Sequence, residues 1–169
     1  VMRCLSLAEM LSKCGCYVVF VMRSQPGDLC SYAESRGFKV ERLHRPFNVT
    51  IPKGSADYQA WLQVDIVTDA ENFLGVSANA DIVVIDHYGI NAKWETIIRC
   101  HLSCKLVVID DLVREHRADL IIDQTVGRSG AEYKLASADS QVLAGSRYAL
   151  LKGQFIDMHG ERFYAIRNV

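Results

Sequence analysis

The chain has 169 residues, half of them hydrophobic, which suits one globular domain with its own core. A formal net charge of −1 gives no electrostatic argument for binding nucleic acid or an anionic membrane. No apolar run approaches the roughly 20 residues that span a bilayer, and no secretory signal is visible. We therefore expect a cytoplasmic globular protein without stable membrane insertion.

The first third of the chain alternates helical and strand patterns. Apolar residues recur at helical spacing up to Gly15, and a continuous apolar run of strand length follows it. Pro46, Pro52 and Gly54 predict a loop over 44–56. The expected elements are helices over 1–14 and 27–37 and strands over 16–23 and 38–43.

The same alternation continues to the end of the chain. The expected elements are helices over 57–74 and 91–103, strands over 81–86, 105–111, 118–124 and 141–145, and a short helical turn over 133–137. Alternating strands and helices predict an α/β fold with a Rossmann-like, doubly wound and mainly parallel sheet. We expect this domain to extend over 1–155.

Polar residues follow three of the predicted strands. They are Asp86-His87-Tyr88, Asp110-Asp111 and Asp123-Gln124. Ligands bind beyond the carboxyl ends of the strands in an open parallel sheet, where these ends share one edge. The pattern therefore predicts a functional edge and leaves the reaction open.

Each candidate also has an ordinary structural explanation. Asp86 suits a helix cap, His87 a hydrogen-bonded structural histidine, and Tyr88 either a rim aromatic or a hydrogen-bond donor to a ligand. Asp110 and Asp111 are adjacent in a strand, so they point to opposite faces and do not suit a catalytic dyad.

Other sites find little support in the sequence. Arg3 lies at the start of the first predicted helix, where backbone N–H groups favour an anion. Cys100, His101 and Cys104 are too few to hold a metal, and the six cysteines suit reduced cytosolic thiols. No dinucleotide, P-loop, nucleophile-elbow or zincin motif is present. We predict no metal and no cofactor.

Several segments nevertheless resemble one family in both order and content. They are VMRCLSLAEML, WLQV with DAENF, DIVVIDHYGI, VVIDD, HRADLIIDQ, YKLA and LAGSRYALLKGQF. From Val1 to about Phe155 the chain resembles the N-terminal half of the UDP-sugar hydrolases of pseudaminic acid biosynthesis (the PseG type). The DHYGI segment and the G-x-x-YALL-x-x-x-F pattern are the most specific parts.

The resemblance implies an inverting hydrolase that releases UDP from UDP-2,4-diacetamido-2,4,6-trideoxy-β-L-altropyranose. The implied architecture is glycosyltransferase-B-like, with two Rossmann-like domains and no essential metal. The N-terminal domain contacts the sugar, and the C-terminal domain holds most of the UDP. The product belongs to bacterial surface-polysaccharide biosynthesis and flagellin glycosylation.

Residue by residue, the resemblance makes Tyr88 the active-site tyrosine, supported by Asp86. It places Arg3 near the substrate, and we group His87 and Asp110 with it as substrate-binding residues. The family's general base is a histidine that precedes the position of Val1, so the chain alone is expected to be inactive. A linker toward the UDP-binding domain is expected over 156–169.

The resemblance also implies a first strand between those predicted over 16–23 and 81–86. Without that strand the sheet would have open edges, so we expect either further residues upstream of Val1 or self-association through these edges. Two alternative functions stay open. One is a sugar transferase of the same architecture, and the other is a non-catalytic domain that binds a sugar nucleotide.

Overall fold

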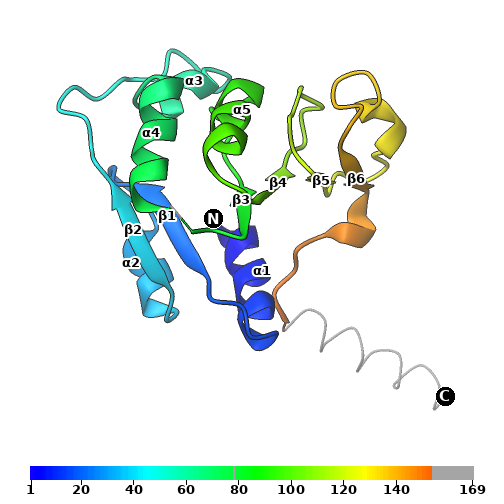
Figure 1. Ribbon diagram of the computed structural model, residues 1–169, viewed down its shortest axis with the longest axis horizontal. Helices are drawn as coiled ribbons and strands as arrows, with labels where there is room; N and C mark the ends of the chain where they lie inside the picture. The colour runs from blue at the N-terminus through cyan, green and yellow to red at the C-terminus, as the bar shows by residue number, and fades with distance from the viewer. Residues whose placement is uncertain (78, 154–169) are drawn as a thin grey trace. The chain divides into compact units, whose positions relative to one another are not determined.

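The computed structural model describes residues 1–77 and 79–153, which form two compact units (Figure 1). One unit comprises Val1–Val18 together with the described residues that follow Tyr148. Its helix α1 (Met2–Lys13) is the first predicted helix, and Gly15 follows it with a φ of +88°, in the left-handed region that favours glycine. The predicted linker over 156–169 lies outside the described residues.

The second unit, Val19–Tyr148, contains the strands and the remaining helices. Its strands are β1 (Val19–Arg23), β2 (Lys39–Leu43), β3 (Ile82–Ile85), β4 (Lys105–Ile109), β5 (Leu120–Asp123) and β6 (Gln141–Ala144). Its helices are α2 (Cys30–Ser35), α3 (Tyr58–Trp61), α4 (Ile66–Val76) and α5 (Ala92–His101), with 3₁₀ turns η1 (Gly130–Tyr133) and η2 (Ser146–Tyr148). The predicted loop over 44–56 has neither helix nor strand.

All of these strands pair in parallel, which confirms the predicted α/β class and is consistent with Rossmann-like topology. They form two sheets, one of order β1-β2 and one of order β3-β4-β5-β6. Within the described residues, β1 and β3 are not hydrogen-bonded to each other. The two strands between which the resemblance places a further strand are therefore edge strands here.

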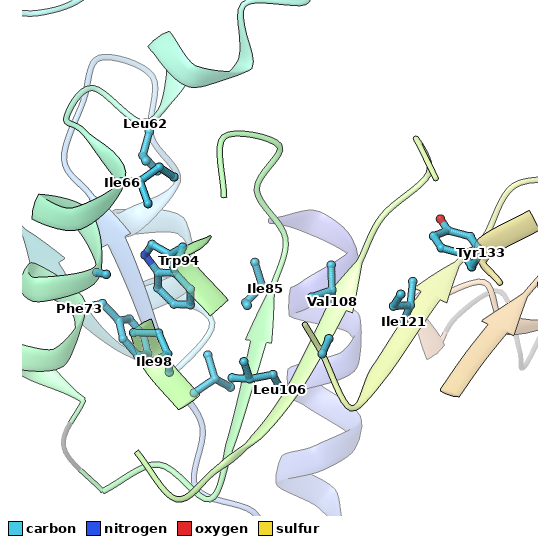
Figure 2. Close-up of a cluster of buried hydrophobic side chains, with 13 residues drawn as sticks. Leu62, Ile66, Phe73, Ile85, Trp94, Ile98, Leu106, Val108, Ile121 and Tyr133 are labelled. Carbon is cyan, nitrogen blue, oxygen red and sulfur yellow. The ribbon is translucent and has the colours of Figure 1, made fainter. Parts of the chain in front are cut away.

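The core lies between helices α4 and α5 and one face of the larger sheet. Phe73 of α4 packs edge-on against Trp94 of α5, with ring centroids 5.1 Å apart. Figure 2 shows these rings beside Ile85, Leu106 and other strand side chains of the same buried cluster. Since side chains alternate along a strand, this packing decides which strand-end residues face inward.

A buried polar contact connects the smaller sheet to this core. Asp69 of α4 is 4% exposed. Its Oδ1 accepts from Arg23 of β1 at 2.5 Å, and its Oδ2 accepts from the indole N–H of Trp94 at 3.0 Å. One carboxylate therefore holds a strand of the β1-β2 sheet and both core helices together.

The prediction of one continuous helix over 57–74 is wrong. The segment contains α3 and α4, separated by a turn in which Gln63 has a φ of 69°. Asp65 then caps α4, because its side chain accepts from the N–H groups of Val67 and Thr68. The apolar spacing continues through the break, so periodicity alone does not reveal it. Another prediction is shifted, since the helical turn expected over 133–137 is η1, which begins at Gly130.

None of the helices in the described part of the chain is both long and apolar enough to cross a membrane.

Candidate functional site

The three polar strand ends lie on one edge of the larger sheet. Strands β3, β4 and β5 are consecutive parallel neighbours, so Asp86, Asp110 and Asp123 stand at their carboxyl ends. This confirms the edge that the strand pattern predicts. The acids nevertheless differ in accessibility, because Asp110 and Asp123 are both 0% exposed whereas Asp86 is half-buried.

Tyr88 lies on this edge, in the loop between β3 and α5. Its hydroxyl donates to Oδ1 of Asp111, at the end of β4, over 2.7 Å. Its ring centroid is 5.0 Å from that of Tyr58 and 6.1 Å from that of Trp61, both from α3. Tyr88 is half-buried, and its ring packs against the rings of Tyr58 and Trp61, which the sequence analysis did not assign to the site.

Arg114 fixes the backbone of the same loop. Its guanidinium donates to the carbonyl oxygens of Tyr88, at 2.7 Å, and Ile90, at 2.9 Å. The guanidinium carbon also lies 5.7 Å from the centre of the Tyr88 ring, within cation–π range. Asp110 orients the guanidinium, since its Oδ1 accepts from Arg114 Nε at 2.8 Å.

The carboxylate of Asp110 accepts hydrogen bonds from other groups of the protein. Its Oδ2 accepts from the backbone N–H groups of Leu112 and Arg114, each at 3.2 Å. Burial pushes its pKa upward, but the nearby His116 imidazole and the Arg114 guanidinium outweigh burial and hold the pKa well below its usual range. The ionised carboxylate therefore serves as the anchor of Arg114, and its predicted contact with substrate stays a prediction.

A buried histidine lies behind this anchor. Nδ1 of His116 is 2.7 Å from Glu95 Oε1, and its Nε2 is 3.6 Å from Asp110 Oδ2. Glu95 also accepts from the backbone N–H of Arg117. Burial opposes protonation of the imidazole, yet the two carboxylates outweigh it and raise the pKa of His116. This buried cluster of charged side chains supports the loop that carries Arg114.

Asp123 organises the neighbouring strand end in a similar way. The buried hydroxyl of Tyr133 donates to its Oδ2 at 2.9 Å, and Arg128 Nε lies 2.6 Å from the same oxygen. Arg128 also donates to the backbone carbonyl of Asp111 at 2.9 Å. Asp110 thus binds Arg114, which holds the backbone of Tyr88. In the same way Asp123 binds Arg128, which holds the backbone of Asp111.

His87 and Gly89 shape the loop from within. His87 Nδ1 accepts from the backbone N–H of Gly89 at 3.0 Å. Burial lowers the pKa of His87, against the opposing effect of the Asp69 and Asp86 charges. A neutral imidazole that accepts a hydrogen bond from the loop backbone suits a structural role. The predicted role of His87 in substrate binding stays a prediction.

Within the unit Val19–Tyr148, the structure connects two of the predicted site residues and places a third at a strand end. Tyr88 and Asp110 are joined through Arg114, and Asp86 directly follows β3. Arg3 lies in the first turn of α1, in the other unit. Its placement near substrate and the catalytic role of Asp86 stay predictions.

Sequence reasoning missed the two arginines, His116 and Glu95. The charged loop DDLVREHR after β4 was the available signal, but its partners are 21 to 26 residues away in the chain. No group of three or more His, Cys, Asp or Glu side chains that could hold a metal ion occurs in residues 1–77 and 79–153.

Comparison with known proteins finds one distant and partial similarity. Over 76 residues the chain is 28% identical to the UDP-2,4-diacetamido-2,4,6-trideoxy-beta-L-altropyranose hydrolase of Campylobacter jejuni. The matched segment covers 44% of this chain and 28% of that protein's length. No protein-family model matches the chain. The chain is thus distantly similar to part of a bacterial hydrolase that acts on a UDP-sugar.

Proposed function

We propose that this chain carries the sugar-side site of a bacterial UDP-sugar hydrolase. The observation that carries the proposal is the similarity to the Campylobacter jejuni enzyme. The substrate we propose is that enzyme's, UDP-2,4-diacetamido-2,4,6-trideoxy-β-L-altropyranose. The reaction would take place in the bacterial cytoplasm, within surface-polysaccharide biosynthesis.

In the proposed reaction, water attacks the anomeric carbon of the sugar on the face opposite UDP. A new C–O bond forms while the water loses a proton to a base, the bond between the anomeric carbon and the β-phosphate oxygen breaks, and UDP leaves with the bonding electron pair. UDP is a good leaving group, so the reaction needs a base and stabilisation of a cationic sugar centre more than a strong acid.

The described residues are suited to stabilise the cationic sugar centre. Tyr88, with Asp86 at the end of the same strand, is the proposed catalytic pair, and the sheet edge where they lie is where open parallel sheets bind ligands. By the resemblance, activation of water belongs to a histidine that precedes the position of Val1. We therefore propose no general base among the residues described above.

The test is release of UDP from this UDP-sugar by the complete product of the gene that encodes the chain. Chromatography measures UDP, and proton NMR of the fresh product measures the anomeric configuration. The proposal expects UDP release without an acceptor and an inverted anomer. Release that requires an acceptor sugar or lipid would favour a transferase, and binding without turnover would favour a non-catalytic domain.

A further inference from the structure

The hydrogen bond between Tyr88 and Asp111 has a direction that decides what Tyr88 can do. The hydroxyl donates to the carboxylate over 2.7 Å. We propose that Asp111 is a positioning residue that accepts the only hydroxyl proton of Tyr88. The Tyr88 oxygen then contacts the reacting molecules as a hydrogen-bond acceptor. This inference rests on the proposed function and deepens it.

The number of protons on Tyr88 and Asp111 decides which of the two groups can donate. A phenol has a single O–H, whereas an ionised carboxylate can only accept. With the proton directed at Asp111, any further group that contacts the Tyr88 oxygen must be a donor. An amide N–H or hydroxyl of the sugar, the attacking water or a base N–H each has that chemistry. The carboxylate also polarises the hydroxyl, which makes its oxygen a better acceptor.

The two partners are fixed independently of each other. Arg114 holds the backbone carbonyl of Tyr88 at 2.7 Å, and Arg128 holds the backbone carbonyl of Asp111 at 2.9 Å. Each arginine is anchored by a fully buried strand-end carboxylate, that of Asp110 or Asp123. Positioning groups supported in this way are preorganised, so little reorganisation accompanies binding.

The end of β4 sets the roles of the two adjacent acids. Leu106 and Val108 of β4 lie in the core, and Asp110, directly after the strand, is 0% exposed. Asp111 follows in the loop, is half-buried, and accepts the hydrogen bond from Tyr88. Of the two adjacent acids, Asp111 is the one whose side chain shares a hydrogen bond with the predicted catalytic tyrosine.

The test compares Asp111→Asn with Asp111→Leu in the complete gene product. The asparagine oxygen still accepts the tyrosine proton, whereas leucine has similar size and no acceptor. Asp139→Leu, at an exposed aspartate before β6, is the matched control. Urea denaturation of each variant establishes that it is folded.

Two readouts separate positioning from a purely structural role. One is the ¹³Cζ chemical shift of Tyr88 in tyrosine-labelled protein, assigned with Tyr88→Phe, and the other is kcat and KM for UDP release. We expect Asp111→Leu to move the Cζ resonance and lower kcat on the order of 10- to 100-fold, as for other orienting partners, with little change in KM. Asp139→Leu should retain the resonance position and kcat, and Asp111→Asn, which keeps an acceptor but loses the charge, should move the resonance less than Asp111→Leu and retain most of kcat.

Different failures have different meanings. An unmoved Cζ resonance in Asp111→Leu overturns the direction of the hydrogen bond, whether or not the protein is active. A moved resonance with kcat unchanged, or with loss confined to KM, overturns the positioning role. Absence of UDP release by the wild-type protein overturns the proposed function and the catalytic part of this inference, while the Cζ shift still decides the hydrogen bond.

Discussion

Gly89 occupies a position in the Tyr88 loop that has no room for a side chain. A Cβ at this residue would lie 2.6 Å from the carbonyl oxygen of Tyr58 and 3.0 Å from Cε1 of His87. The first of these atoms belongs to the backbone, so it cannot move away by a change of rotamer. Gly89→Ala must therefore displace the start of α3 or the loop itself.

The expected cost is that of overpacking a closely packed site, about 1–3 kcal/mol. For a chain of this size we expect a decrease in Tm of roughly 2–12 °C, at about 2–4 °C per kcal/mol. The assay is urea and thermal unfolding followed by circular dichroism. Because Tyr58 contacts Tyr88, with ring centroids 5.0 Å apart, the variant should also lose UDP-releasing activity.

Gly75→Ala is the matched control. Gly75 lies inside α4, and a Cβ there would meet nothing within 4 Å. Alanine in a helix interior is more favourable than glycine by roughly 0.5–1 kcal/mol, so this variant should be as stable as wild type or more so. Equal stability of Gly89→Ala and Gly75→Ala would refute the steric argument.

Three further predictions follow from buried charges and strand edges. Asp69→Ala leaves Arg23 and the indole N–H of Trp94 buried without their carboxylate, so unfolding free energy should fall by about 3–5 kcal/mol, and a loss below about 1 kcal/mol in urea titrations would contradict this. The raised pKa of His116 contributes stability that is fully present below its ordinary value of 6.5 and is lost as pH rises through the raised value. His116→Gln should therefore flatten the decline in stability above pH 6.5, whereas an unchanged slope would exclude His116 as its source. Because β1 and β3 each have an unpaired edge among residues 1–77 and 79–153, we expect the 18.9 kDa chain to elute as an oligomer in size-exclusion chromatography, and a stable monomer would argue against exposed pairing edges.

The sequence predicts the strands and the shared edge of their polar ends because these depend on local patterns. Continuous apolar runs followed by acids place β3, β4 and β5 and their polar ends correctly. The sequence places Asp110 and Asp111 as neighbours within a strand over 105–111, whereas β4 ends at Ile109 and both acids lie beyond it. They nevertheless differ, because Asp110 is buried and Asp111 is paired with Tyr88.

The contacts of Arg114 could not be predicted in the same way. Arg114 reaches Tyr88, 26 residues earlier, only because β3 and β4 are neighbours and the following loop folds back on them. The break between α3 and α4 was also missed, since a capping aspartate and one positive φ interrupt a helix whose apolar spacing continues. The separation into two sheets likewise depends on pairing between distant segments.

The central claim is that Tyr88 serves a hydrolase acting on a UDP-sugar. Its most direct test is the rate of UDP release from UDP-2,4-diacetamido-2,4,6-trideoxy-β-L-altropyranose by the complete gene product and its Tyr88→Phe variant. Tyr32→Phe, at an exposed tyrosine of α2, is the control. We expect release by the wild type and by Tyr32→Phe, and a kcat lowered on the order of 10- to 100-fold in Tyr88→Phe. Equal rates in all three proteins, or no release by the wild type, would contradict the account.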